Sequence, residues 1–114
     1  MDLAEIEALL RKSISLDPRL ADAHLQLGVL LHDQHRDQEA VPEFQAAIRF
    51  KPNDPDAYYR LAQAFVRTGD KERGQEEFQL YDKLHKQQVD EIEKRRHEIQ
   101  QFVFTPGGPA KTNP

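Results

Sequence analysis

Residues 21–54 read ADAHLQLGVLLHDQHRDQEAVPEFQAAIRFKPND, and residues 55–88 read PDAYYRLAQAFVRTGDKERGQEEFQLYDKLHKQQ. When these two stretches of 34 residues are aligned, their apolar and small positions coincide. The coinciding pairs are His24 with Tyr58, Leu27 with Leu61, Gly28 with Ala62, Leu31 with Phe65, Ala40 with Gly74, Phe44 with Phe78 and Phe50 with Leu84. A fixed period of this length predicts a stacked array of small, similar units.

Half of the same pattern precedes the first complete unit. The positions one period earlier are Ile6, Leu10, Ser13, Leu16 and Pro18, which match Ala40, Phe44, Ala47, Phe50 and Pro52. These positions all belong to the second helix of a unit, so the first helix of this unit is missing from the sequence. The side chains that would pack against it are Leu3, Ile6, Leu9 and Leu10. We therefore expect the chain to be a fragment or the end of a longer array.

The repeated positions resemble the tetratricopeptide repeat family. The first full repeat carries the family motif at His24, Leu27, Gly28, Leu31, Ala40, Phe44, Ala47 and Pro52. The second keeps the first six motif positions, at Tyr58, Leu61, Ala62, Phe65, Gly74 and Phe78, and departs from the motif at Tyr81 and Lys86. The resemblance covers roughly residues 4–84. It implies an all-α fold, a helical-hairpin array wound as an alpha-alpha superhelix, with about two and a half repeats and an extended C-terminal helix.

The expected organisation follows from this alignment. Residues 1–18 are a partial repeat that holds the second helix only, 21–54 are repeat 1, and 55–88 are repeat 2. Residues 85–104 form an extended or capping C-terminal helix, and the Pro- and Gly-rich residues 105–114 form a flexible tail. Turn residues place the helices near 3–16, 19–34, 38–50, 55–68 and from 71 onward, because Asp54 and Asp70 can cap helix starts and Gly69 can end a helix.

The C-terminal third carries an apolar stripe. The stripe comprises Val89, Ile92, Ile99, Phe102 and Val103, and is interrupted by Arg95 and Arg96. No Pro or Gly stands between residues 84 and 106 to stop a helix. Two structures fit: one continuous helix from residue 70 to about 104, which we favour, or a bend near Gln87 that folds residues 88–103 back as a cap. A continuous helix would leave the stripe in water unless a second copy or another protein covered it.

The resemblance also implies where a partner would bind, because the first helices of such repeats line a groove. In this chain the groove positions hold Leu25, Val29, His32, Tyr59, Gln63, Val66 and Arg67 among others. Some relatives use Lys and Asn there to clamp the terminal carboxylate of a chaperone tail. This chain has Leu25, Val29, Tyr59 and Gln63 at those positions, so that clamp is not expected. The mixture of apolar and polar groups instead suits an amphipathic helix or an apolar peptide.

No chemical site emerges from the sequence. Cysteine is absent, the net charge of −4 is mild, and apolar runs such as residues 29–31 are far too short to span a membrane. His32 and His35 lack a third metal ligand and are interpreted as solvent-exposed histidines. The basic run at residues 94–96 is surrounded by acidic residues and is interpreted as a solvated helix face. We therefore expect no cofactor, no metal, no nucleic acid and no membrane. No signal peptide is visible, and the compartment is cytoplasmic if the chain is complete as written.

The functional prediction is a non-catalytic protein–protein interaction scaffold that binds a peptide or helix of a partner in its concave groove. One alternative is a self-assembly module that forms a homodimer through its long C-terminal helix. Another is an accessory domain of a larger enzyme or regulator. The identity of the partner does not follow from the residues.

Overall fold

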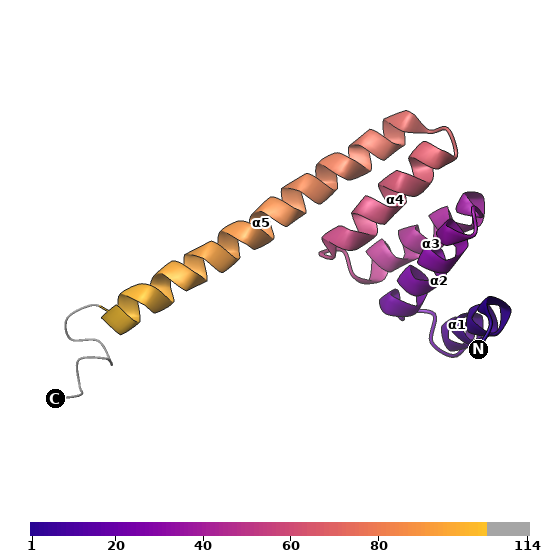
Figure 1. The fold of residues 1–114 in the computed structure, drawn as a ribbon, viewed down its shortest axis with the longest axis horizontal. Helices are drawn as coiled ribbons and strands as arrows, with labels where there is room; N and C mark the ends of the chain where they lie inside the picture. Colours follow the sequence, from indigo (N-terminus) through magenta and orange to yellow (C-terminus); the bar gives the residue numbers. More distant parts are fainter. Residues whose placement is uncertain (105–114) are drawn as a thin grey trace. The chain divides into compact units, whose positions relative to one another are not determined.

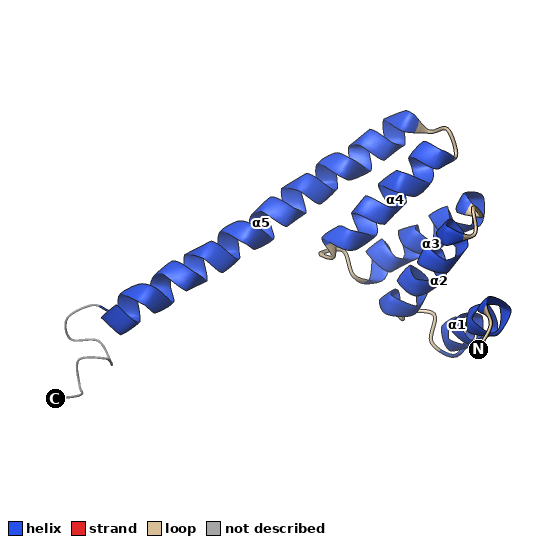
Figure 2. Ribbon diagram, in the orientation of Figure 1, coloured by secondary structure: helices blue, strands red, loops and turns tan. Residues whose placement is uncertain are grey.

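The computed structural model describes residues 1–104, and all the regular structure in that part of the chain is helical (Figures 1 and 2). The helices are α1 (Leu3–Leu16), α2 (Ala21–Asp33), α3 (Asp37–Phe50), α4 (Pro55–Arg67) and α5 (Lys71–Phe104). The predicted all-α fold is confirmed. The expected flexible tail, residues 105–114, lies outside the described residues.

The described residues divide into two units, one of residues 1–84 and one that begins at residue 85. The first unit holds α1 to α4 and the beginning of α5. Here α2 packs most extensively on α3, α3 packs on α4, and α1 packs on α2. This is the order of contacts that stacked helical hairpins give, with α2–α3 and α4–α5 as the two complete hairpins.

The core of the first unit is a small set of side chains from α2, α3 and α4. Its most deeply buried large members are Leu27, Leu31 and Phe44. Gly28 is buried beside Phe44, and a β-carbon placed on Gly28 would come within 2.5 Å of the phenyl Cε1. The small residue predicted at this motif position thus allows α2 and α3 to approach one another.

The two hairpin turns share one geometry. The amide of Arg36 donates to the carbonyl of Leu31 at 2.8 Å, and the amide of Asp70 donates to the carbonyl of Phe65 at 2.8 Å. In both turns the preceding residue has positive φ, 60° at His35 and 96° at Gly69. This is the Schellman ending of a helix, which normally uses glycine at that position. His35 adopts it without being glycine, which costs about 1 kcal/mol.

Substitutions at these two turn positions should therefore change the free energy of unfolding in opposite directions. Gly69→Ala is expected to lower the free energy of unfolding by about 1 kcal/mol, because φ stays positive while no atom crowds the new methyl group. His35→Gly should raise it by a few tenths of a kcal/mol up to about 1 kcal/mol. Urea denaturation of both variants measures the difference, and a stabilising Gly69→Ala would contradict this description of the turn.

Helix α1 lies against α2 with only one side covered. Leu10 and Ile14 pack against the core, and Glu7 forms an ion pair with Arg36 at 2.7 Å. Ile6 is half-buried. The large leucines of the other side remain in solvent, with Leu3 at 53%, Leu9 at 51% and Leu16 at 78% exposure. No residue of α1 is buried, so this helix is held by one face alone.

Helix α5 runs without interruption from Lys71 to Phe104. The continuous helix favoured above is therefore confirmed as secondary structure. Of the stripe predicted on this helix, the largest members are exposed, with Ile92 at 63%, Ile99 at 62% and Phe102 at 64%, while Val103 is half-buried. No helix of the described residues is both long and apolar enough to cross a membrane.

Candidate functional site

A hollow of about 360 Å³ opens between α2, α4 and the first turns of α5. Its lining residues are His32, Gln63, Val66, Arg67 and Phe78, a set we call the groove. Four of the five were predicted as groove residues from the sequence. From the sequence, Phe78 was assigned only as a motif position of the second repeat. It is only half-buried and also borders the groove.

The other predicted groove residues lie elsewhere. Leu25 was expected on the groove surface but is buried in the core, against which the α1 residues Leu10 and Ile14 also pack. Val29 is half-buried and lines a separate hollow between α1 and α2. Tyr59 is 40% exposed, and its ring lies edge-on to Phe78 with centroids 5.4 Å apart. The structure therefore brings together the end of α2 and the end of α4, and not the whole length of the predicted surface.

His32 was predicted to be exposed, and this is wrong. Its side chain is buried and its Nδ1–H donates to the carboxylate of Asp37, which is also buried. Nη1 of Arg67 donates to the carbonyl of His32 at 2.8 Å and lies 3.3 Å from Oδ2 of Asp37. A buried carboxylate needs such charged and hydrogen-bonding partners. The cluster ties the start of α3 to the ends of α2 and α4, and so shapes one wall of the groove.

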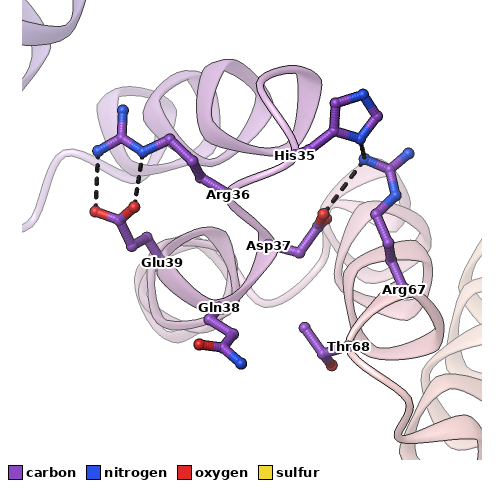
Figure 3. Close-up of a pocket in the computed structure, with 7 residues that line it drawn as sticks. All are labelled: His35, Arg36, Asp37, Gln38, Glu39, Arg67 and Thr68. Carbon is purple, nitrogen blue, oxygen red and sulfur yellow. Dashed lines mark hydrogen bonds and ion pairs between the residues drawn. The ribbon is translucent and has the colours of Figure 1, made fainter.

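A second, polar hollow of about 530 Å³ lies beside the turn between α2 and α3 (Figure 3). Its lining residues are His35, Arg36, Asp37, Gln38, Glu39, Arg67 and Thr68. His35 is exposed here, as predicted, with its Nδ1 3.4 Å from Arg67. The hydroxyl of Thr68 already donates to the carbonyl of Phe65 at 2.9 Å.

The charges around this hollow are paired with one another. Nε of Arg36 donates to Glu39 at 2.7 Å, and Nη1 of Arg36 donates to Glu7 at 2.7 Å. Hydrogen bonds from Arg36 hold the pKa of Glu7 and the pKa of Glu39 below their usual range. No group of three metal-binding side chains occurs in residues 1–104. The hollow therefore offers a satisfied ionic network, with no nucleophile placed beside a free base.

The carboxylate of Glu77, in the first unit, is not fully hydrogen-bonded. Oε2 of Glu77 is buried without a hydrogen-bond partner. Burial, with a smaller contribution from the charge of Glu76, raises the pKa of Glu77. Burial, with a smaller contribution from the charge of Glu77, raises the pKa of Tyr58. Folding thus shifts the Glu77 carboxyl toward its protonated form relative to the unfolded chain.

Glu77→Gln should consequently stabilise the protein at neutral pH. A raised folded-state pKa means that folding disfavours the charged carboxylate, so the penalty is present above that pKa and disappears below the unfolded-state value. The expected gain is below about 1 kcal/mol, because the side chain is only half-buried and solvent screens it. Urea denaturation at about pH 7 and about pH 4 should show the gain only at the higher pH. The exposed Glu98→Gln serves as the control and should show no gain at either pH.

Comparison with known proteins identifies the repeats. Residues 31–69 match the family described as TPR repeat, and residues 55–86 match the family described as Tetratricopeptide repeat. The matched part of the chain, residues 31–86, thus contains tetratricopeptide repeats, as its motif positions predicted. No curated protein sequence matches it.

The solved structures similar to this chain include several of MamA. The structure named MamA MSR-1 has a TM-score of 0.71 at 23% identity, over 75% of this chain and 49% of that one. The structure named MamA AMB-1 has a TM-score of 0.70 at 24% identity, over 74% of this chain and 50% of that one. The chain spans about half the length of these structures. At these identities the likeness concerns the fold.

Proposed function

We propose that this protein is a non-catalytic interaction scaffold whose groove binds an apolar face of a helix or peptide from another protein. The observation that carries the proposal is the groove itself. Val66 and Phe78 supply apolar surface, and His32, Gln63 and Arg67 supply polar groups beside it. Repeat arrays of this kind act through such surfaces.

The polar groups limit which ligands would suit the groove. Arg67 is already held by Asp37 and by the carbonyl of His32, so its charge is partly neutralised. A strongly acidic peptide would therefore gain little from it. Val66 and Phe78 favour an aliphatic or aromatic anchor, and Gln63 can pair with a polar group at the edge of the ligand. An amphipathic helix with one large apolar anchor matches this arrangement.

A random peptide display library, selected on the whole chain, tests this proposal without a known partner. Selected peptides should bind the wild type and lose affinity by about tenfold or more for Val66→Asp, since a charge would replace apolar contact area. Leu80→Asp is the matched control, because Leu80 and Val66 have the same exposure, 42%, and Leu80 does not line the groove. Equal losses for both variants, or no selectable peptide, would contradict the proposal.

A second candidate is self-assembly through the distal part of α5. The observation favouring it is that Ile92, Ile99 and Phe102 are all more than 60% exposed. Apolar side chains in a row on one helix are typical of an interface. Light scattering over a concentration series should give a mass above that of the 13.2 kDa monomer. Ile92→Glu with Ile99→Glu should return the mass to the monomer, whereas Gln101→Glu, on the same helix, should not.

A further inference from the structure

The exposed leucines of α1 occupy informative repeat positions. A step of 34 residues places Leu9 on Glu43 and Leu16 on Phe50 of α3. In the complete repeat both of these α3 residues contact His24 of α2. Oε1 of Glu43 lies 3.3 Å from Nδ1 of His24, and the ring of Phe50 stacks on the imidazole at 5.9 Å. The uncovered side of α1 therefore corresponds to the side of α3 that contacts α2. In a complete repeat, this is the side on which the second helix packs against the first.

The chemistry of this contact differs between α1 and the complete repeats. His24 and Tyr58 stand at position 4 of their repeats, and Glu43 and Glu77 stand at position 23. His24 is paired with Glu43, and Glu77 lies close enough to Tyr58 to contribute to its raised pKa. In α1 position 23 is Leu9, which offers no charge. A first helix that fits α1 should therefore carry an apolar residue, rather than a polar ring, at position 4.

The distal part of α5 carries such a residue in the same period. Val89, Ile92 and Ile99 stand 34 residues after Pro55, Tyr58 and Phe65 of α4. Ile92 is thus at position 4, and it is exposed at 63%. At positions 7 and 8 the family has Leu and a small residue, and here Arg95 and Arg96 replace them. The α1 residue that would face position 8 is Leu10, which stands where the complete repeat has Phe44. The guanidinium of Arg96 is already paired with Glu93 at 3.1 Å.

We propose that α1 of one copy binds the distal part of α5 of a second copy, with Ile92 lying between Leu9 and Leu16 as His24 lies between Glu43 and Phe50. This inference rests on the self-assembly candidate above and specifies its two surfaces. The contact joins two different surfaces, so each pair of copies still has one α1 surface and one distal α5 surface unoccupied. Association then continues head to tail with rising concentration, in contrast to a closed dimer of two α5 helices.

Sedimentation velocity over a concentration series tests the proposal with two single variants. Leu9→Glu blocks the α1 surface and Ile92→Glu blocks the α5 surface, and both positions are more than half exposed, so the fold should tolerate the changes. Each variant alone should weaken self-association by about tenfold or more. Their mixture should form a one-to-one complex and stop there, because each partner contributes its intact surface. Far-UV circular dichroism verifies that both variants remain helical.

A paired exchange tests the predicted contact itself. Leu9→Glu combined with Ile92→His recreates, between copies, the carboxylate and imidazole that Glu43 and His24 place together. This double variant should recover part of the association that Leu9→Glu loses. A monomeric wild type overturns both the inference and the self-assembly candidate. Loss of association in Ile92→Glu with none in Leu9→Glu overturns only the inference, and indicates contact between two α5 helices.

Discussion

Replacing Phe44 by alanine is expected to lower the free energy of unfolding by about 3–5 kcal/mol, a large part of the stability of a small domain. Phe44 is fully buried, and its ring lies against Gly28, where the two helices of the first repeat meet. Removing the ring leaves a cavity that the backbone of α2 cannot fill. Urea denaturation followed by circular dichroism measures the loss.

Phe78 provides the control, because it stands at the same repeat position. It is only half-buried and borders the groove. Phe78→Ala should therefore cost clearly less than Phe44→Ala, since less apolar area leaves contact with protein atoms. Equal losses at the two positions would show that the two repeats contribute equally to the core, which contradicts the burial described above.

Adding a methyl group at Gly28 should destabilise the protein by about 1–3 kcal/mol, although alanine is the better helix former. The new β-carbon would lie 2.5 Å from the ring of Phe44, so either the ring or the helix must move. The matching position in the second repeat is Ala62, which is fully buried without such a conflict. The cost therefore arises from the pairing of this glycine with this phenylalanine.

A double-mutant cycle separates that pairing from other causes. Phe44→Leu reduces the ring to the residue that α1 carries at the same position, Leu10. Gly28→Ala should be less destabilising in the Phe44→Leu background than in the wild type, with a coupling energy of about 1 kcal/mol or more. Additive losses would mean that the methyl group conflicts with something other than the ring.

Much of the fold could be predicted because each repeat has small and large residues at the positions where its two helices pack together. The aligned small and large residues located both hairpins, and the turn residues placed the helix ends within a few residues of those observed. The absence of Pro and Gly between residues 84 and 106 favoured the continuous α5 that the structure has. These signals come from residues close together along the chain, so they can be recognised in a single sequence.

The parts that could not be predicted depend on contacts across turns and between helices. His32 is buried because Asp37 reaches it across the α2–α3 turn, a turn that has His35 where glycine is the usual signal. Leu25 is buried in the core cluster, whereas Tyr59, one period later, remains exposed. The position of a residue in its repeat does not by itself decide whether its side chain is buried. In so short an array, residues at the same position have different neighbouring helices.

The proposed partner-binding surface is the groove between α2, α4 and α5. The most direct measurement is a titration of ¹⁵N-labelled protein with a display-selected peptide, followed by amide chemical shifts. If the groove binds the peptide, the largest shifts should cluster at Gln63, Val66 and Arg67, with smaller ones at His32 and Phe78. Largest shifts on α1 or on the outer face of α3, with those five residues unmoved, would contradict it.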